Sequence, residues 1–186
     1  MTVVEIDLVR PTLHAAQQQV MDEARRFNVL QCGRRFGKTT LGVDLVIDPA
    51  LDAKPTAWFA PTYKLLAEAW REIVRATKDI TDRCNNQDHR LELITGGSID
   101  GWSLDNADAG RGYKYARAVI DEAGTVKDLQ EAWEQAIRPT LVALVAYPLG
   151  DAPLLLRLIL NHQASNTERS GHQQRNNDNC RMQRYQ

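Results

Sequence analysis

The sequence predicts an α/β fold: a mainly parallel sheet flanked by helices, with one β-hairpin. Short apolar runs alternate with amphipathic segments along the first 140 residues, the pattern that strands and connecting helices produce. Two of these runs end in residues suited to phosphate chemistry. The length of 186 residues and the 43% hydrophobic content fit a globular chain with a buried core.

The first two strands are expected at residues 27–31 and 56–60. A glycine-containing turn leads from the first strand into a helix over about residues 38–47. We expect Asp48-Pro49 to end this helix, because the residue before proline disfavours the α conformation. The second strand precedes a helix with Thr62 as its N-cap, whose apolar residues recur at three- and four-residue steps.

A hairpin is predicted where Gly96-Gly97 separates two alternating segments, residues 90–94 and 98–103. Residues 118–121 form the third expected buried strand. A helix over residues 127–137 follows, and we expect it to stop near Pro139.

The segment from Cys32 to Thr40 has the features of a phosphate-binding loop, since it follows a predicted strand and opens a predicted helix. Backbone N–H groups at a helix N-terminus favour an anion. Lys38 would contact the β and γ phosphates of ATP, and Thr39 would place its hydroxyl on Mg²⁺. The usual pattern has glycine where Cys32 stands, and Gly33 comes one residue later. An ordinary strand-to-helix turn is the alternative. The candidate nucleotide-binding residues of the loop are Cys32, Gly33, Arg34, Arg35, Phe36, Gly37, Lys38, Thr39 and Thr40.

A second motif, Ala118-Val-Ile-Asp-Glu-Ala123, is an apolar run that ends in two carboxylates. Asp121 would hold the Mg²⁺ shell, and Glu122 would orient and deprotonate the attacking water. Many strands end in solvated acids, so this signal is weak alone. Its combination with the upstream loop predicts an NTP-hydrolysing site.

Two further residues are candidates. Arg111 lies between two glycines in a loop before the Asp-Glu strand, where it could neutralise developing phosphate charge or simply be solvated. Gln17, upstream of the first strand, has an amide that offers a donor and an acceptor together, which matches the edge of adenine. A solvated helix face is the alternative for Gln17.

These motifs, in this order, resemble the ATPase domain of tailed-phage terminase large subunits. The shared segments are C-G-R-R-F-G-K-T-T, A-P-T-Y-K at residues 60–64, the Gly96-Gly97 hairpin, A-G-R-G and A-V-I-D-E-A. They span about residues 13–141, and the short phosphate loop with an internal arginine is typical of the family.

The resemblance implies a P-loop NTPase fold of the additional-strand, catalytic-glutamate type, in an ATP-hydrolysing motor that packages double-stranded DNA into procapsids. It implies that Gln17 lies by adenine, that Arg34 senses the γ phosphate and that Arg111 reaches a neighbouring subunit's site. The implied partners are double-stranded DNA, the procapsid portal, the terminase small subunit and further copies in a homo-oligomeric ring, with no membrane. The implied location is the cytoplasm of an infected or lysogenic bacterial host, outside the stable virion.

The chain departs from the family after Thr140. The family's coupling motif, a tripeptide with Ser or Thr that ends in proline, has no counterpart in the apolar run 141–147. This run could still form the central strand beside the phosphate-loop strand. The acidic pattern of the family's nuclease domain is also absent, so we expect no DNA cleavage.

We therefore predict an ATPase domain over residues 1–140, with an N-terminal arm at 1–26. Residues 141–160 are an apolar segment that forms the last strand or strands, or is translated out of frame. Residues 161–186 are polar, and we expect disorder.

Composition excludes some other classes. The net charge of −1 excludes a strongly basic surface as a global property, and the three cysteines have no zinc-binding spacing. Two alternatives stay open beside a packaging ATPase. One is a helicase-like or other DNA-dependent ATPase, and the other is a truncated nucleotide-binding remnant without turnover.

Overall fold

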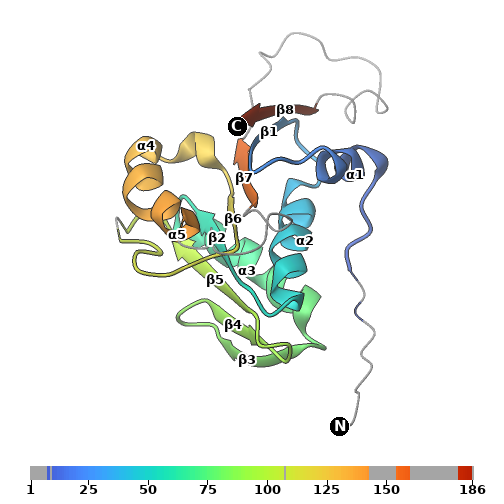
Figure 1. Cartoon of the computed structure of the whole chain (residues 1–186), viewed down its shortest axis with the longest axis vertical. Coiled ribbons are helices and arrows are strands. Elements are labelled where there is room, and N and C mark those ends of the chain that lie inside the picture. The colour runs from blue at the N-terminus through green and yellow to red at the C-terminus, as the bar shows by residue number, and fades with distance from the viewer. Residues whose placement is uncertain (1–7, 9, 107, 143–153, 160–179, 186) are drawn as a thin grey trace.

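The computed structural model describes residues 8, 10–106, 108–142, 154–159 and 180–185. The described strands form one sheet in the order β3-β4-β5-β2-β6-β7-β1-β8 (Figure 1). The strands are β1 (Phe27–Cys32), β2 (Pro55–Ala60), β3 (Thr81–Asn85), β4 (Arg90–Leu93), β5 (Ser98–Ser103), β6 (Arg117–Ile120), β7 (Leu154–Ile159) and β8 (Cys180–Tyr185).

The centre of the sheet is parallel and its edges are antiparallel. Parallel pairing joins β5 to β2, β2 to β6, β6 to β7 and β7 to β1. At one edge β3, β4 and β5 are antiparallel neighbours, and at the other β8 runs antiparallel to β1. The predicted mainly parallel α/β sheet is confirmed, and the predicted hairpin is the pair β4–β5.

Helices cover both faces of this sheet (Figure 1). They are α1 (Ala15–Asp22), α2 (Lys38–Leu51), α3 (Tyr63–Thr77), α4 (Leu129–Glu131) and α5 (Arg138–Val142), with a 3-10 turn η1 (Ala123–Thr125) and a π-helix η2 (Ala132–Ile137). Within the described part of the chain, no helix has the length and apolar character needed to cross a membrane.

Two hydrophobic cores lie on opposite faces because side chains alternate along the strands. In β2, Trp58 and Ala60 pack in the larger core with α2 and α3. Their neighbours Ala57 and Phe59 pack in the smaller core, which Ile137 and Leu141 close from the other side. The central strands are therefore buried on both faces, which explains why they read as continuous apolar runs.

Helix α2 is longer than the sequence predicts, because Pro49 lies inside it rather than beyond it. A proline leaves the carbonyl four residues earlier without its helical donor. Here that carbonyl belongs to Leu45, and it accepts a hydrogen bond of 3.0 Å from the Arg117 guanidinium. Arg117 also pairs with Asp48 at 3.2 Å. A side chain from β6 thus replaces the missing backbone donor.

The helix expected at residues 127–137 extends further than predicted. The segments α4, η2 and α5 follow one another without a break from Leu129 to Val142, with a π-helical stretch at Ala132–Ile137. Pro139 therefore lies inside the helical segment instead of ending it, two residues after the π-helical stretch.

The last strands also differ from expectation. The strand β7 (Leu154–Ile159) lies in the apolar segment 141–160, where the last strand or strands were expected, but it is this strand and not residues 141–147 that pairs with β1. Leu141 and Val142 end α5, and residues 143–147 lie outside the described part. Cys180–Tyr185, inside the segment expected to be disordered, forms β8. The boundary at residue 140 and the out-of-frame origin stay predictions.

The β4–β5 turn packs against the end of α2. Thr95 Oγ1 donates a hydrogen bond of 2.8 Å to the Ala50 carbonyl. A Cβ added at Gly97 would lie 2.0 Å from the same carbonyl oxygen. Glycine is therefore required at Gly97 by the close approach of α2.

Gly97→Ala should lower the free energy of unfolding by about 1–3 kcal/mol, because the new methyl overlaps backbone that cannot easily move. Chemical denaturation measures this loss. Gly33→Ala is the matched control, since an added Cβ there meets no atom within 4 Å. An equal loss in both variants would contradict the steric explanation.

Candidate functional site

The loop between β1 and α2 has the geometry of an anion-binding turn. Arg35 and Gly37 both adopt left-handed backbone conformations, with φ of 65° and 79°. Gly37 is the N-cap of α2, and no side chain caps the helix there. The N–H groups that begin α2 are thus free of a side-chain cap, and an anion is their natural partner.

Lys38 folds back over its own loop. Its Nζ donates to the carbonyls of Cys32 at 3.4 Å and Gly33 at 3.2 Å. The ammonium is thus held beside the anion-binding turn by weak, replaceable contacts, so that it can turn toward a phosphate.

The Asp-Glu pair lies at the carboxyl end of β6. Asp121 is 9% exposed, and its Oδ1 accepts a hydrogen bond of 2.9 Å from the backbone N–H of Glu122. Glu122 has φ of 51° and ψ of 31°, a left-handed conformation that is rare for glutamate. Such conformations cost about 1–3 kcal/mol and cluster at functional sites.

Burial sets the electrostatics of the two carboxyls. The pKa of Glu122 is raised to about 7: burial is the largest cause, the negative charge of Asp121 adds to it, and the positive charge of Lys38 opposes it. Burial also raises the pKa of Asp121, against the Glu122 N–H and Lys38. Among the described residues, Glu122 Oε2 is buried without a hydrogen-bond partner. This oxygen is suited to accept a proton near neutral pH.

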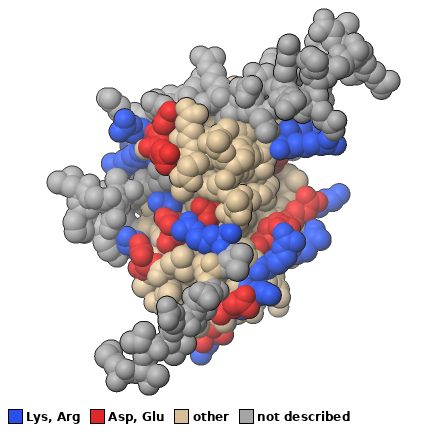
Figure 2. Space-filling model, turned by 90° about the vertical axis from the view of Figure 1, so that its right-hand side faces the viewer, with Lys and Arg blue, Asp and Glu red and all other residues tan. Residues whose placement is uncertain are grey.

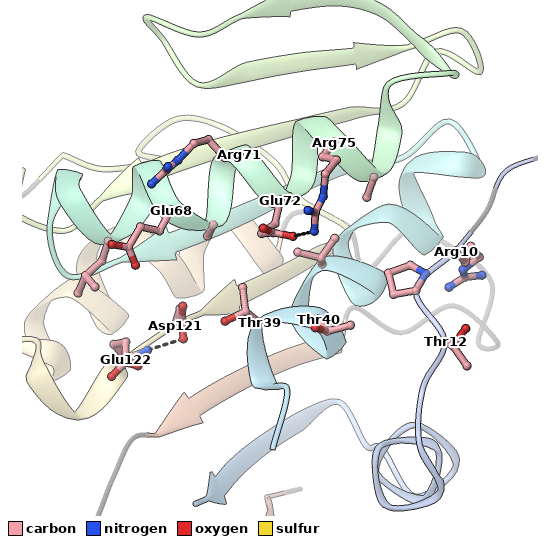
Figure 3. A pocket seen from close by; sticks show the side chains of 15 residues that line it. Arg10, Thr12, Thr39, Thr40, Glu68, Arg71, Glu72, Arg75, Asp121 and Glu122 are labelled. Atoms are coloured by element: carbon pink, nitrogen blue, oxygen red, sulfur yellow. Dashed lines mark hydrogen bonds and ion pairs between the residues drawn. The ribbon is translucent and has the colours of Figure 1, made fainter. Parts of the chain in front are cut away.

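One cavity of about 1090 Å³ brings the second motif to the start of α2. Figure 3 shows Thr39 of α2 close to Asp121, with Glu122 beside it and α3 along the opposite wall. The lining residues are Arg10, Pro11, Thr12, Thr39, Thr40, Val43, Leu65, Glu68, Ala69, Arg71, Glu72, Arg75, Ala76, Asp121 and Glu122.

These donors fit Mg²⁺ that arrives with a nucleotide. The described residues hold no group of three His, Cys, Asp or Glu side chains able to bind a metal alone. Mg²⁺ commonly uses one or two carboxylates together with substrate phosphates and water. Thr39 and Asp121 supply a hydroxyl and a carboxylate in one cavity, which matches that requirement.

Gln17 contacts the loop itself. Its Nε2 donates to the carbonyls of Phe36 at 3.2 Å and Gly37 at 2.9 Å, and its Oε1 accepts from the His14 N–H at 2.9 Å. The side chain is 3% exposed. The structure thus places Gln17 behind the phosphate loop, and its contact with adenine stays a prediction.

Three arginines lie apart from the carboxylates. Arg34 and Arg35 are exposed on the loop. Arg111 is exposed and pairs with Asp108 at 2.7 Å, outside the cavity. Within one chain, the structure does not bring Arg111 to Glu122.

Side chains of α3 form one wall of the cavity, and the sequence motifs did not predict this. Glu68, Arg71, Glu72 and Arg75 line the cavity from α3, and Arg75 pairs with Glu72. Their three- and four-residue spacing on the polar side of an amphipathic helix was the available signal. Figure 2 shows Lys and Arg side chains interspersed with Asp and Glu on the face viewed there.

Comparisons with known proteins identify the fold. No protein-family model and no curated protein matches the chain. The ATPase domain of the Thermus phage P74-26 large terminase matches with a TM-score of 0.63 and 18% identity, over 81% of this chain and 70% of that one. The large terminase of bacteriophage HK97 matches with a TM-score of 0.61 and 17% identity, over 80% of this chain and 33% of that one.

A third match is the large terminase of a thermophilic bacteriophage in complex with ADP, with a TM-score of 0.56 and 14% identity. The alignment covers 80% of this chain and 39% of that one. The chain therefore has the fold of phage large terminase ATPase domains, and the predicted α/β fold class is confirmed. It spans only a minor part of the two longer terminases.

Glu122→Gln should unfold at a higher temperature than the wild type above pH 7, in the absence of ATP and Mg²⁺. Between the ordinary pKa of 4.5 and the folded value of about 7, the folded chain holds the Glu122 proton more tightly than the unfolded chain. Wild-type stability therefore falls as pH rises through this window. The difference in unfolding temperature between Glu122→Gln and the wild type should become smaller as pH falls toward 4.5.

Thermal unfolding across this pH range measures the difference. Glu68→Gln removes a carboxylate from the same cavity and reports the effect of net charge alone. An advantage of Glu122→Gln that stays constant with pH would contradict the raised pKa.

Proposed function

We propose that the chain is the ATP-hydrolysing motor domain of a phage terminase large subunit and powers the packaging of double-stranded DNA into procapsids. The observation that carries this proposal is the shared cavity of Thr39, Asp121 and Glu122, beside the phosphate loop. The fold of large terminase ATPase domains supports it.

In the proposed site, the N–H groups at the start of α2 bind the phosphates of ATP, and Lys38 leaves the carbonyls of Cys32 and Gly33 to contact the β and γ phosphates. Thr39 and Asp121 hold Mg²⁺, which when bound neutralises phosphate charge. The full set of loop residues from Cys32 to Thr40 stays the proposed nucleotide-binding segment.

Glu122 is the proposed general base. Its buried, unpartnered Oε2 orients the attacking water and accepts its proton. The left-handed backbone at Glu122 directs this side chain into the cavity that Thr39 and Asp121 share. The proposed role of Asp121 is to hold Mg²⁺, because the hydrogen bond from the Glu122 N–H to its Oδ1 already fixes the orientation of its carboxylate.

Two arginines would neutralise negative charge on the phosphates of ATP. Arg34, exposed on the loop, is proposed to sense the γ phosphate. Arg111 is proposed to act on the site of a neighbouring copy, since it lies outside the cavity of its own chain and is exposed. A homo-oligomeric ring would bring it there.

The wider setting follows from the same proposal. Double-stranded DNA, the procapsid portal and the terminase small subunit are the proposed partners. The proposed location is the cytoplasm of an infected or lysogenic bacterial host.

ATP hydrolysis by the purified chain tests the function. Glu122→Gln should lower kcat by about 10²–10⁴-fold, the usual contribution of a general base. Lys38→Ala should weaken ATP binding as well, because it removes a phosphate contact. Steady-state phosphate release and nucleotide binding measure the two effects.

Glu68→Gln is the control, since it neutralises a carboxylate in the same cavity outside the proposed machinery. ATP binding without turnover in the wild type would favour a truncated remnant. Turnover stimulated by single-stranded DNA rather than by double-stranded DNA and portal would favour a helicase-like ATPase.

Arg111→Ala should lower turnover and leave ATP binding intact. Mixing Arg111→Ala with Glu122→Gln chains should then restore part of the activity, because one chain supplies Arg111 and its neighbour supplies Glu122. Arg83→Ala, at an exposed arginine of β3, is the matched control. Mixtures no more active than the separate variants would refute action between neighbours.

A further inference from the structure

We propose that His14 is a positioning residue for the phosphate loop: together with Gln17, it fixes the carbonyls of Phe36 and Gly37 and so directs the N–H groups that bind phosphate. The inference rests on the proposed function, because it concerns the same site. It gives α1 and the arm before it a role in nucleotide affinity.

His14 and Gln17 form a reciprocal capping box at the start of α1. The Gln17 N–H donates to His14 Nδ1 at 3.3 Å, while Gln17 Oε1 accepts from the His14 N–H at 2.9 Å. Because Nδ1 accepts a hydrogen bond, the proton of the neutral ring is on Nε2. Nε2 lies 3.0 Å from the Phe36 carbonyl, so it donates to the loop.

The two side chains therefore deliver three hydrogen bonds to two consecutive loop carbonyls. Phe36 accepts from His14 Nε2 at 3.0 Å and from Gln17 Nε2 at 3.2 Å. Gly37 accepts from Gln17 Nε2 at 2.9 Å. Both donor hydrogens of the Gln17 amide are thus used on the loop.

These bonds control the opposite side of the loop. In a trans peptide the N–H points away from the C=O of the same unit, and the described backbone has no cis bonds. Holding the Phe36 carbonyl toward α1 turns the Gly37 N–H away from α1. The Gly37 carbonyl is held both by Gln17 and by the Leu41 N–H of α2 at 3.0 Å, which together turn the Lys38 N–H away from α1. Two proposed phosphate donors are thus aimed in advance, and the Gly37 N–H is the one that depends on His14 and Gln17.

Close packing prevents the loop from slipping on these contacts. The Phe36 ring is 2% exposed and meets the His14 ring edge to face at 5.0 Å. A Cβ added at Gly37 would lie 2.6 Å from Gln17 Nε2. The arm that enters α1 is also fixed to α2, because Arg10 pairs with Asp44 at 2.8 Å and with Asp48 at 3.0 Å.

The test compares two probes on the full chain, ADP with Mg²⁺ and inorganic tripolyphosphate, which has no adenosine. His14→Ser keeps an oxygen able to cap α1 but loses the donor to Phe36. Gln17→Met keeps the length of the side chain and adds no charge, but loses both donations to the loop. Calorimetry should show that each variant lowers the affinity for both probes by the same factor, roughly three- to tenfold per net hydrogen bond lost.

In hydrolysis, KM for ATP should rise by this factor with kcat almost unchanged, as for an interaction that binds substrate and transition state equally. A partly unfolded enzyme would instead lose kcat at constant KM. Gln18→Ser, at an exposed residue of α1 whose amide contacts Asp22, is the control and should leave both affinities unchanged.

Loss of ADP affinity with tripolyphosphate affinity kept would overturn the inference, because the pair would then act on adenosine. Unchanged affinities for both probes would overturn it as well. If His14→Ser does not fold, Gln17→Met decides by the same comparison. A wild-type chain that binds neither probe would overturn the proposed function itself.

Discussion

The parallel alignment of β1, β7 and β6 is the constraint on which the candidate site depends. Parallel strands present their carboxyl ends at one edge of a sheet, so the loop after β1 and the carboxylates after β6 face the same side. With β7 between them, the two strand ends lie about 10 Å apart. That gap suits a phosphate group held between Lys38 and Glu122. A direct β1–β6 pairing would close it.

The site concentrates unfavourable features that the rest of the fold offsets. Glu122 combines a left-handed backbone, a buried unpartnered oxygen and a raised pKa. Asp121 loses solvation beside it. The two cores on either face of the sheet hold β6 in place, with Val119 in one and Ala118 and Ile120 in the other. The buried sheet thus fixes the position of the two carboxyls despite these unfavourable features.

Much of this arrangement could be predicted from local sequence. Apolar runs located β1, β2 and β6, because strands buried on both faces carry no polar alternation. The phosphate loop and the Asp-Glu pair were predicted from residue types in strand-to-helix and strand-end contexts. The strand β3, Thr81–Asn85, was missed because its residues are polar and mostly exposed. The apolar segment 141–160 indicated a last strand, and β7 lies in it. The exact position of β7, and the existence of β8, depend on pairing with β1 across more than a hundred residues, which no local pattern encodes.

Pro49 links three distant parts of the chain. The Leu45 carbonyl that it leaves without a helical donor accepts a hydrogen bond from Arg117, which is linked through Asp48 to the arm residue Arg10. Loss of Arg117 would leave the buried Leu45 carbonyl without the donor that replaces the one missing at Pro49. An ordinary residue at position 49 would supply its own N–H to this carbonyl, and the guanidinium would no longer be needed there. The two positions are therefore expected to change together during evolution, so that a lineage with an ordinary residue at 49 is released from keeping a cation at 117.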